Sequence, residues 1–446
     1  MTTPRARLPK AAASAAHRRP DARSLAMQVV ERVLYDQAYA AAALSAEFSR
    51  YPQLTVRERA FTTELTYTAL RCRRALEERL SAQAPRGLPK DRVVRAALLV
   101  AAVQALLLDR ATLAIAVDAA VTRVKAQRGA QSAGFVNALL RRIAEQPPLN
   151  RAAALRANLP KWLEERLVAA VGIEETDALV GAHASLGTSP NSIDIRLVKG
   201  RAAPEWLVHA TPGKWLPQSR RVSGIGDPRG YPEYESGDFV IQEEGAQLIA
   251  WALDVPEGAT VLDVCAGRGQ KTSLLAERVG PEGAVWSTDL HESKLEALRE
   301  EMNRLHLSNV QTQALDWSVG GGNLRTDFEF ALVDAPCTGT GTLYKRPEIL
   351  DRLKPDDPGR MGELATQILR NVSKYCRGGA QVIYAVCSVL PEEAEAVLSR
   401  VEDIFEQRPF TTQALRSALG DQACAGRLLP LRHGTDGYFL AQLQKR

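Results

Sequence analysis

The sequence has 446 residues, of which 45% are hydrophobic and 24% charged, and its formal net charge is +5 at pH 7. This length is too great for one ordinary hydrophobic core, so it predicts two or three domains, and the composition excludes a disordered or fibrous chain. The mild positive charge permits an anionic partner without requiring one. The most apolar run, residues 96–109, contains Gln104 and is too short to span a membrane, so we expect a cytoplasmic protein that does not bind membranes.

The six cysteines are far apart in the sequence, and they form no C-x-x-C pair. No group of histidine and cysteine residues has the spacing of metal ligands, so we expect no bound metal, and reduced cytosolic thiols are the natural interpretation. The cysteines are Cys72, Cys265, Cys337, Cys376, Cys387 and Cys424. An isolated cysteine is most often a small buried side chain, which is the expectation for Cys72, Cys376 and Cys424.

The N-terminal part is expected to contain a basic tail and a bundle of helices. Residues 1–21 carry several arginines around the run AAASAA but no apolar segment, which indicates a disordered basic tail rather than a secretory signal. The alternative is a tail that helps to hold nucleic acid by its charge. Residues 22–145 show helical periodicity, for example at Leu25, Val29 and Val33, and they predict a compact all-helical domain.

The remaining sequence divides into a short mixed segment and a longer alternating one. Residues 150–238 combine an amphipathic helix, the alternating strand SIDIRLV and a stretch rich in Gly and Pro, and we interpret them as a small α+β linker domain. In residues 239–446 strands alternate with helices, which predicts a doubly wound, mainly parallel sheet. The last segment of this pattern, GYFLAQLQ, is expected to be an antiparallel strand at the edge of the sheet.

A candidate cofactor site follows from the strand ends, because ligands bind at the carboxyl ends of strands in such sheets. The stretch DVCAGRGQKT lies at the end of the first strand, where Gly267 and Gly269 would let the backbone approach a ligand closely. Asp289 ends the second strand and could accept the ribose hydroxyls, and Asp316 ends the third and could bind an adenine amino group. Because the stretch matches neither G-x-G-x-x-G nor a P-loop, S-adenosylmethionine is the cofactor that the pattern favours.

Two of the cysteines are expected to meet beside this turn. Cys337 follows the fourth strand in VDAPCTGTG, and Cys387 ends the fifth in YAVCSVLPEE. Such a pair suits methylation at C5 of a pyrimidine: a thiolate that adds to C6 makes C5 nucleophilic, and a second acid–base group then helps H5 and the thiolate to leave. Asp334 could bind the ring at N3 and its exocyclic amine. From the residues alone, ordinary packing remains an equal alternative for both thiols.

At these residues the sequence resembles the RsmB (Fmu/Sun) family of RNA cytosine-C5 methyltransferases, which act on 16S ribosomal RNA. LDVCAGRGQKT resembles the cofactor loop of that family, VDAPCTGTG and YAVCSVLPEE resemble its two cysteine motifs, and DGYFLAQL resembles its terminal strand. Upstream, RERAFTTELTYTALRCRRALEERL and SAGFVNALLRRI resemble its NusB-like RNA-binding domain. The resemblance covers roughly residues 22–445 and implies a Rossmann-like methyltransferase domain at residues 239–446.

The resemblance implies particular roles for the site residues. Cys387 would be the nucleophile toward C6, Cys337 the partner that aids proton removal and product release, and Asp334 would lie near the methyl group and the base. Asp289 would bind the ribose of S-adenosylmethionine, and Asp316 would bind its adenine. The cofactor loop would consist of Cys265, Ala266, Gly267, Arg268, Gly269, Gln270 and Lys271.

The sequence departs from the family pattern at several positions. Residues 267–271, GRGQK, stand where the family usually has Ala-Pro-Gly-Gly-Lys, Val386 replaces a threonine, and Ala394 replaces an asparagine. Both thiols are kept, so these departures bear on cofactor affinity and on the target nucleotide more than on the type of reaction. Two other classes stay open: a methyltransferase that acts on another base atom or on protein, and a non-catalytic RNA-binding factor of ribosome assembly.

Ribosomal RNA, free or in a pre-ribosomal particle, is the expected partner, and a monomer is the expected state. The helical domain and the basic linker would hold the RNA mainly through its phosphates, with Lys345 and Arg346 near the site. The target base must be unstacked or flipped out of a helix, because the thiols have to reach C6.

Overall fold

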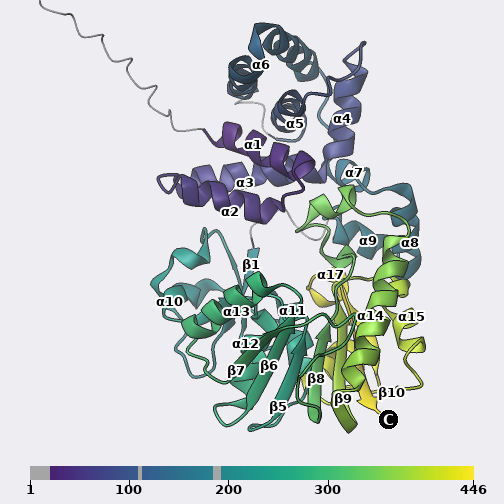
Figure 1. Cartoon of the computed structure of the whole chain (residues 1–446). Helices are drawn as coiled ribbons and strands as arrows, with labels where there is room; N and C mark the ends of the chain where they lie inside the picture. The colour runs from purple at the N-terminus through teal and green to yellow at the C-terminus, as the bar shows by residue number, and fades with distance from the viewer. Residues whose placement is uncertain (1–20, 109–112, 184–191) are drawn as a thin grey trace, which may run out of the picture. The chain divides into compact units, whose positions relative to one another are not determined.

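The computed structural model of the chain (Figure 1) describes residues 21–108, 113–183 and 192–446. The chain forms two compact units, and the boundary between them lies between Pro148 and Leu149. The described part of the first unit is helical, and the second unit contains two sheets. Within the described ranges, no helix is both long enough and apolar enough to cross a bilayer.

Helices α1, α3 and α5 of the first unit begin at polar capping residues. The Asp21 side chain accepts a hydrogen bond from Ser24 N at 2.7 Å, and Thr55 and Glu58 form a reciprocal capping box. Asp91 caps a further helix by accepting from two backbone N–H groups. The described helices of this unit are α1 (Ala22–Tyr35), α2 (Ala40–Arg50), α3 (Val56–Arg71), α4 (Arg73–Ala82), α5 (Arg92–Leu106) and α6 (Leu113–Ala144).

The apolar faces that the sequence predicts are buried in this unit. Leu25, Val29 and Val33 of α1 are buried, and so is every residue of α5 from Ala96 to Leu106. A helix that is apolar on all sides belongs in the centre of a bundle, which is where the most apolar run of the sequence lies.

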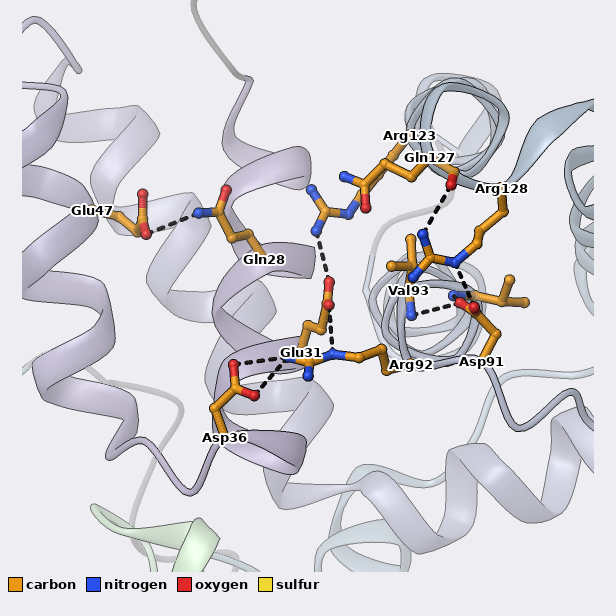
Figure 2. Close-up of polar contacts among 11 residues, drawn as sticks. Gln28, Glu31, Asp36, Glu47, Asp91, Arg92, Val93, Arg123, Gln127 and Arg128 are labelled. Atoms are coloured by element: carbon orange, nitrogen blue, oxygen red, sulfur yellow. Dashed lines mark hydrogen bonds and ion pairs between the residues drawn. The ribbon is translucent and has the colours of Figure 1, made fainter.

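Ion pairs join α1 to α5 and α6 (Figure 2). Glu31 accepts hydrogen bonds from Arg92 Nε at 2.8 Å and from Arg123 Nη2 at 2.9 Å, and Arg92 also donates to Asp36 at 2.8 Å. The side chains of Arg92 and Asp36 are partly exposed, so their pair stabilises the bundle little and mainly fixes the positions of the helices. Helix α6 is interrupted at Gly129, whose φ of 82° is left-handed, so it consists of two helices.

The second unit begins with three helices and a small antiparallel sheet. The sheet has the strand order β2-β3-β1-β4, and Ile195, Leu207, Val222 and Phe239 form its core. Strand β1 is the strand predicted from SIDIRLV. The elements are α7 (Arg151–Arg156), α8 (Lys161–Val171), α9 (Ile173–Leu179), β1 (Ser192–Leu197), β2 (Thr211–Pro212), β3 (Ser219–Ser223), α10 (Pro232–Glu235) and β4 (Phe239–Ile241).

An eight-stranded, mainly parallel sheet forms the centre of the second unit (Figure 1). Its order is β10-β12-β9-β8-β5-β6-β7, with β11 paired to β12. The strand order reverses around β5, and ligands bind at such a switch point. Its elements are α11 (Glu244–Ala252), β5 (Thr260–Val264), α12 (Gln270–Val279), β6 (Ala284–Asp289), α13 (Glu292–Arg304), β7 (Val310–Ala314), β8 (Phe328–Asp334), α14 (Asp357–Ser373), β9 (Cys376–Val386), α15 (Glu395–Ser399), β10 (Phe405–Gln407), α16 (Gln413–Leu419), β11 (Ala425–Leu428), α17 (Pro430–His433) and β12 (Tyr438–Lys445).

Side chains of the central strands alternate between two buried faces. Leu262 of β5 and Tyr384 of β9 belong to a core that α14 and α15 cover. Val261 and Ile383, one position away on the same strands, belong to a core that α11, α12 and α16 cover. This period of two along strands that are buried on both sides is the pattern of a doubly wound sheet. The predicted fold class is therefore confirmed.

The expected place of the last strand was wrong in one respect. Strand β12 is antiparallel, as predicted, but it is an interior strand that pairs with β9 on one side and with β10 and β11 on the other. Strands β10 and β11 have three and four residues, so their sequences carry too few positions for a period of two to be recognised. They pair with the edge of β12, which would otherwise be open.

Candidate active site

The two cysteines of the predicted motifs lie at the carboxyl ends of β8 and β9. These strands are parallel neighbours with Asp334 opposite Ala385, and just beyond them Ala335 N donates to Ala385 O at 2.9 Å. Cys337 and Cys387 follow, and their Sγ atoms lie 3.2 Å apart. Both side chains are partly exposed. The structure therefore brings together the two thiols that the sequence singles out.

The two thiols differ in their tendency to ionise. A hydrogen bond from the Cys337 thiol to the Cys387 sulfur lowers the pKa of Cys387, and Arg346 and Lys271 lower it further, although burial and Asp334 oppose them. The same hydrogen bond, together with burial, raises the pKa of Cys337 well above its usual value. Cys387 is therefore the thiol that ionises first, with Cys337 as the neutral donor beside it.

Lys271 and Asp334 form an ion pair next to the thiols. Lys271 Nζ donates to Asp334 Oδ2 at 2.7 Å, and the two side chains are 15% and 28% exposed. Burial disfavours the ammonium, but the carboxylate of Asp334 outweighs burial and raises the pKa of Lys271. This pair connects the end of the predicted cofactor loop to the carboxylate that is predicted to lie near the base.

A buried carboxyl that the sequence interpretation missed joins the two cysteine loops. Glu393 accepts hydrogen bonds from Thr338 N and Thr338 Oγ1, both at 2.6 Å, and from Ser388 Oγ. Thr338 and Ser388 directly follow the two cysteines. Burial raises the pKa of Glu393, and these hydrogen bonds act against the rise. The only signal in the sequence is the Glu-Glu pair in LPEE, and periodicity cannot tell which of its carboxyls is buried.

A close backbone contact also fixes these loops. Gly341 N donates to Cys387 O at 3.0 Å, and Gly437 N donates to Gly341 O at 2.8 Å. A Cβ atom on Gly341 would lie 1.8 Å from Gly437 O, so only glycine fits there. The contact joins the loop after the first cysteine to the loop that holds the second and to the start of β12.

The predicted cofactor loop connects β5 to α12 through left-handed residues. Cys265, Gly267 and Gly269 have φ values of 60°, 62° and 85°. A Cβ on Gly269 would lie 2.6 Å from Leu298 Cγ, whereas a Cβ on Gly267 would meet nothing within 4 Å. Gly269 is therefore required by packing, and Gly267 leaves open space above the loop. Burial raises the pKa of the Cys265 thiol far above its usual value, which keeps this thiol neutral.

The other residues of the loop are held by backbone contacts or are exposed. Ala266 N donates to Thr288 O at 2.9 Å. Arg268 and Gln270, two of the departures from the family pattern, are both exposed. The Gln270 side chain donates to Ile241 O at 2.9 Å, so it ties the loop to the small antiparallel sheet.

The carboxylates predicted to bind the nucleoside stand at the next two strand ends. Asp289 is the last residue of β6, and its side chain accepts from Gly267 N at 3.1 Å and pairs with Lys294 at 3.1 Å. Asp316 follows β7 and is partly exposed, and hydrogen bonds from Ser318 lower its pKa. Both carboxylates are therefore placed at the edge where the cofactor loop lies.

These residues fit a methyl donor that contains a nucleoside. Gly267 leaves room above the loop, and the side chain of Leu290, which follows Asp289, is 57% exposed and offers an apolar surface. Beneath the loop, Asp263 Oδ1 is buried without a hydrogen-bond partner among the described residues, and burial raises the pKa of Asp263 to about 7. In the described ranges, no cluster of three or more His, Cys, Asp or Glu side chains could hold a metal ion.

The two residues predicted to contact RNA differ in their surroundings. Lys345 Nζ pairs with Asp436 Oδ2 at 2.8 Å. Burial lowers the pKa of Lys345, but the carboxylates of Asp436 and Glu243 outweigh it and raise that pKa. Arg346 is partly exposed and lies near enough to Cys387 to stabilise a thiolate there. The charge of Lys345 is thus matched within the protein, whereas Arg346 contributes to the thiol site.

Helices α8 and α9 pack behind both cysteine loops. Leu163 and Leu167 of α8 share a core with Leu343, from the loop after the first cysteine, and with Val389, from the loop after the second. Arg166 forms an ion pair with Glu392 at 3.2 Å. Part of the segment that the sequence assigns to a linker therefore supports the thiol site.

A parallel sheet with a glycine-containing turn at its switch point and carboxylates at the next strand ends is the arrangement of an α/β enzyme that binds a nucleoside-containing cofactor. Comparison with known families defines the class as a methyltransferase that uses S-adenosylmethionine. Residues 250–444 match the family described as 16S rRNA methyltransferase RsmB/F, and residues 20–145 match the NusB family.

Full-length relatives identify the family within this class. Ribosomal RNA small subunit methyltransferase B of Thermus thermophilus is 30% identical over 403 residues, which cover 87% of this chain and 89% of that protein. The protein of the same name from Xanthomonas campestris is 29% identical over 408 residues, with coverages of 87% and 89%. The chain belongs to the RsmB family of ribosomal RNA small subunit methyltransferases, as its motifs indicate.

Solved structures support the fold. The crystal structure of PH0851 superposes with a TM-score of 0.81 at 22% identity and covers 96% of this chain and 99% of its own. The crystal structure of NSun6 from Pyrococcus horikoshii with SFG has a TM-score of 0.55 at 17% identity, with coverages of 64% and 98%. At these identities the likeness shows the fold alone.

Proposed function

We propose that this chain transfers a methyl group from S-adenosylmethionine to C5 of a cytosine in 16S ribosomal RNA, through a covalent bond between Cys387 and C6. The observation that carries the proposal is the pair of sulfur atoms 3.2 Å apart. Methylation of an amine or a hydroxyl group needs no thiol, whereas addition to C6 needs a thiolate and, later, a proton acceptor. Membership of a 16S ribosomal RNA methyltransferase family supports the choice of substrate.

In the proposed reaction, Cys387 starts as a thiolate, because the hydrogen bond from Cys337 and the charges of Arg346 and Lys271 stabilise it. Its sulfur bonds to C6, and the electrons of the C5–C6 double bond move onto C5 and the ring. The carboxylate of Asp334, in the orientation that Lys271 gives it, lies at the N3 edge of the ring and accepts a hydrogen bond from the exocyclic amine. S-adenosylmethionine, when bound, supplies the methyl group that C5 accepts.

Cys337 then acts on the proton at C5. Once the Cys387 sulfur is bonded to C6, it no longer accepts the hydrogen bond that raises the pKa of Cys337 most. The Cys337 thiol is partly exposed and therefore releases its own proton to solvent more easily at this stage than in the free enzyme. The resulting thiolate removes H5, the C5–C6 double bond forms again, and Cys387 leaves as a thiolate.

The remaining assignments follow from the positions of the strand ends. We propose that the cofactor lies along residues 265–271, with Asp289 at its ribose and Asp316 at its adenine. Arg346 contacts the RNA strand near the target base, and Lys345 does so in exchange for its pair with Asp436. Residues 22–145 and 150–238 hold the RNA through its phosphates, and a monomer acts in the cytoplasm on free ribosomal RNA or on a pre-ribosomal particle.

The test combines 16S ribosomal RNA, S-adenosylmethionine and three variants of the full chain. Bisulfite sequencing should show one cytosine protected by the unchanged chain, and Cys387→Ala should abolish this protection. Cys337→Ala should trap a protein–RNA adduct that survives a denaturing gel. Cys424→Ala, which changes a partly exposed cysteine outside the site, should behave like the unchanged chain.

The alternatives predict different results in the same experiment. Full turnover by Cys387→Ala would reject this nucleophile. A methyltransferase for another atom would label RNA or protein with both cysteine variants active and no cytosine protected. A non-catalytic assembly factor would bind RNA but not S-adenosylmethionine.

A further inference from the structure

The contact between two thiols of unequal acidity supports a chemistry separate from methyl transfer. We propose that Cys337 and Cys387 form a site of reversible oxidation, at which a peroxide joins the two sulfur atoms in a disulfide and switches the site off. The formation of this bond rests on the geometry of the thiols alone. Only its effect on activity rests on the proposed function.

The strands that lead to the two cysteines have a spacing that suits a disulfide. Cys337 and Cys387 follow the ends of two parallel neighbours, and neighbouring strands are about 4.8 Å apart. Cα atoms joined by a disulfide lie about 4.4–6.8 Å apart. Hydrogen bonds from Ala335 N to Ala385 O and from Gly341 N to Cys387 O keep this spacing on both sides of the pair. The sulfur atoms are 3.2 Å apart and have to approach by only about 1.2 Å to reach the length of an S–S bond.

The surroundings of the other thiols direct an oxidant to Cys387. Its pKa is lowered, chiefly by the hydrogen bond from Cys337. Burial raises the pKa of Cys265 far above its usual value and that of Cys376 to about 12. Thiolates that are accessible and lie beside a second cysteine are the ones that peroxides oxidise reversibly. Cys387 is partly exposed and has such a neighbour, so it meets each of these conditions.

The reaction balances with hydrogen peroxide as the oxidant. The Cys387 thiolate attacks one peroxide oxygen and becomes a sulfenic acid, and the other oxygen leaves as hydroxide, which takes up a proton to form water. The sulfur of Cys337 then attacks the sulfenic sulfur, the S–S bond forms, and the second oxygen leaves as water. The two thiols lose two electrons, and the peroxide gains them. Reduction by a dithiol restores both thiols.

This oxidation would remove the nucleophile and the proton acceptor in one step. It would also protect Cys387, because a sulfenic acid that forms a disulfide does not proceed to the irreversible sulfinic acid. The site would therefore be inactive under oxidation and recoverable afterwards, whereas a single thiol in the same place would be lost.

The experiment treats the full chain with one equivalent of hydrogen peroxide and follows the thiols by mass. Titration should show the loss of two of the six thiols. Digestion with trypsin without reduction should give one cross-linked species, made of residues 326–345 and 378–400. A dithiol should release the two peptides and restore methyl transfer to at least nine-tenths of its starting rate.

Two variants and two outcomes decide the proposal. Cys424→Ser should still form the cross-link, and Cys337→Ser should instead accumulate sulfinic acid at Cys387. Sulfinic acid at Cys387 in the unchanged chain without the cross-link would overturn the proposal, and so would a cross-link that contains Cys265. A cross-link in a chain that methylates no cytosine would reject the proposed function and leave this inference standing.

Discussion

The substitution Gly341→Ala tests whether the close backbone contact sets the position of the thiols. A Cβ atom at this position would lie 1.8 Å from Gly437 O, and real Cβ atoms essentially never approach closer than 3.0 Å. One of the two chain segments must therefore shift by at least the difference, 3.0 − 1.8 = 1.2 Å. Because Gly341 N donates to Cys387 O, a shift of the Gly341 segment moves the loop that carries Cys387. A displacement of about 1 Å at a reacting group lowers the rate by about 100-fold.

We therefore expect kcat/KM for 16S ribosomal RNA to fall by about 100-fold in Gly341→Ala, measured with labelled S-adenosylmethionine. The affinity for the cofactor should change little, because Gly267 and its loop lie at another strand end. Gly359→Ala is the matched control, since a Cβ there meets nothing within 4 Å, and alanine is favoured over glycine in a helix. Near-ultraviolet circular dichroism checks that both variants fold. A folded Gly341→Ala with unchanged kcat/KM would show that the contact does not position the thiols.

Two further substitutions test the support of the site. The pKa of Asp263 in the folded chain is about 7, above its ordinary value. Between about pH 4 and pH 7 the folded state therefore binds one proton more than the unfolded state. The folded state loses stability as the pH rises through this window, by up to about 1.4 kcal/mol per pH unit. Asp263→Asn should melt higher than the unchanged chain at pH 8 and like it near pH 4, and equal pH slopes for both proteins would contradict this account. Leu163→Ala should lower the free energy of unfolding of the second unit by about 2–5 kcal/mol in urea, because Leu163 is fully buried behind the cysteine loops. Val208→Ala, at a residue that is 76% exposed, should cost less than about 0.5 kcal/mol, and an equal effect of both would reject the packing role of α8.

The sequence predicts those parts of the fold that appear as a regular spacing of apolar residues along one segment. The helical faces at Leu25, Val29 and Val33 are buried as expected, because a period of about 3.6 residues over several turns has few other interpretations. The two thiols meet for a similar reason: each follows a strand in a parallel sheet, and the carboxyl ends of neighbouring strands share one edge.

The contacts that the sequence does not reveal depend on pairs of residues far apart in the chain. Glu393 and Thr338 are separated by 55 residues, and nothing in the local pattern of either marks the other. The same holds for Gly341 and Gly437, each of which also fits an ordinary turn. The interior place of β12 depends on two short strands that are too brief to show a period of their own. Contacts between distant segments of the chain determine these features, and a single sequence does not show which distant segments are in contact.

The hydrogen bond between the thiols means that neither cysteine can be changed without affecting the other. Cys337→Ala removes the proton acceptor, and it also removes the chief cause of the lowered pKa of Cys387, so that pKa rises. Cys337→Ser removes the acceptor thiol as well, but its hydroxyl can still donate to the Cys387 sulfur. Both variants should trap an adduct with RNA. The pH at which trapping reaches half of its maximal rate should be higher for Cys337→Ala than for Cys337→Ser. Superimposable pH profiles would show that the donor does not control the ionisation of Cys387, and the charges of Lys271 and Arg346 would then have to stabilise the thiolate on their own.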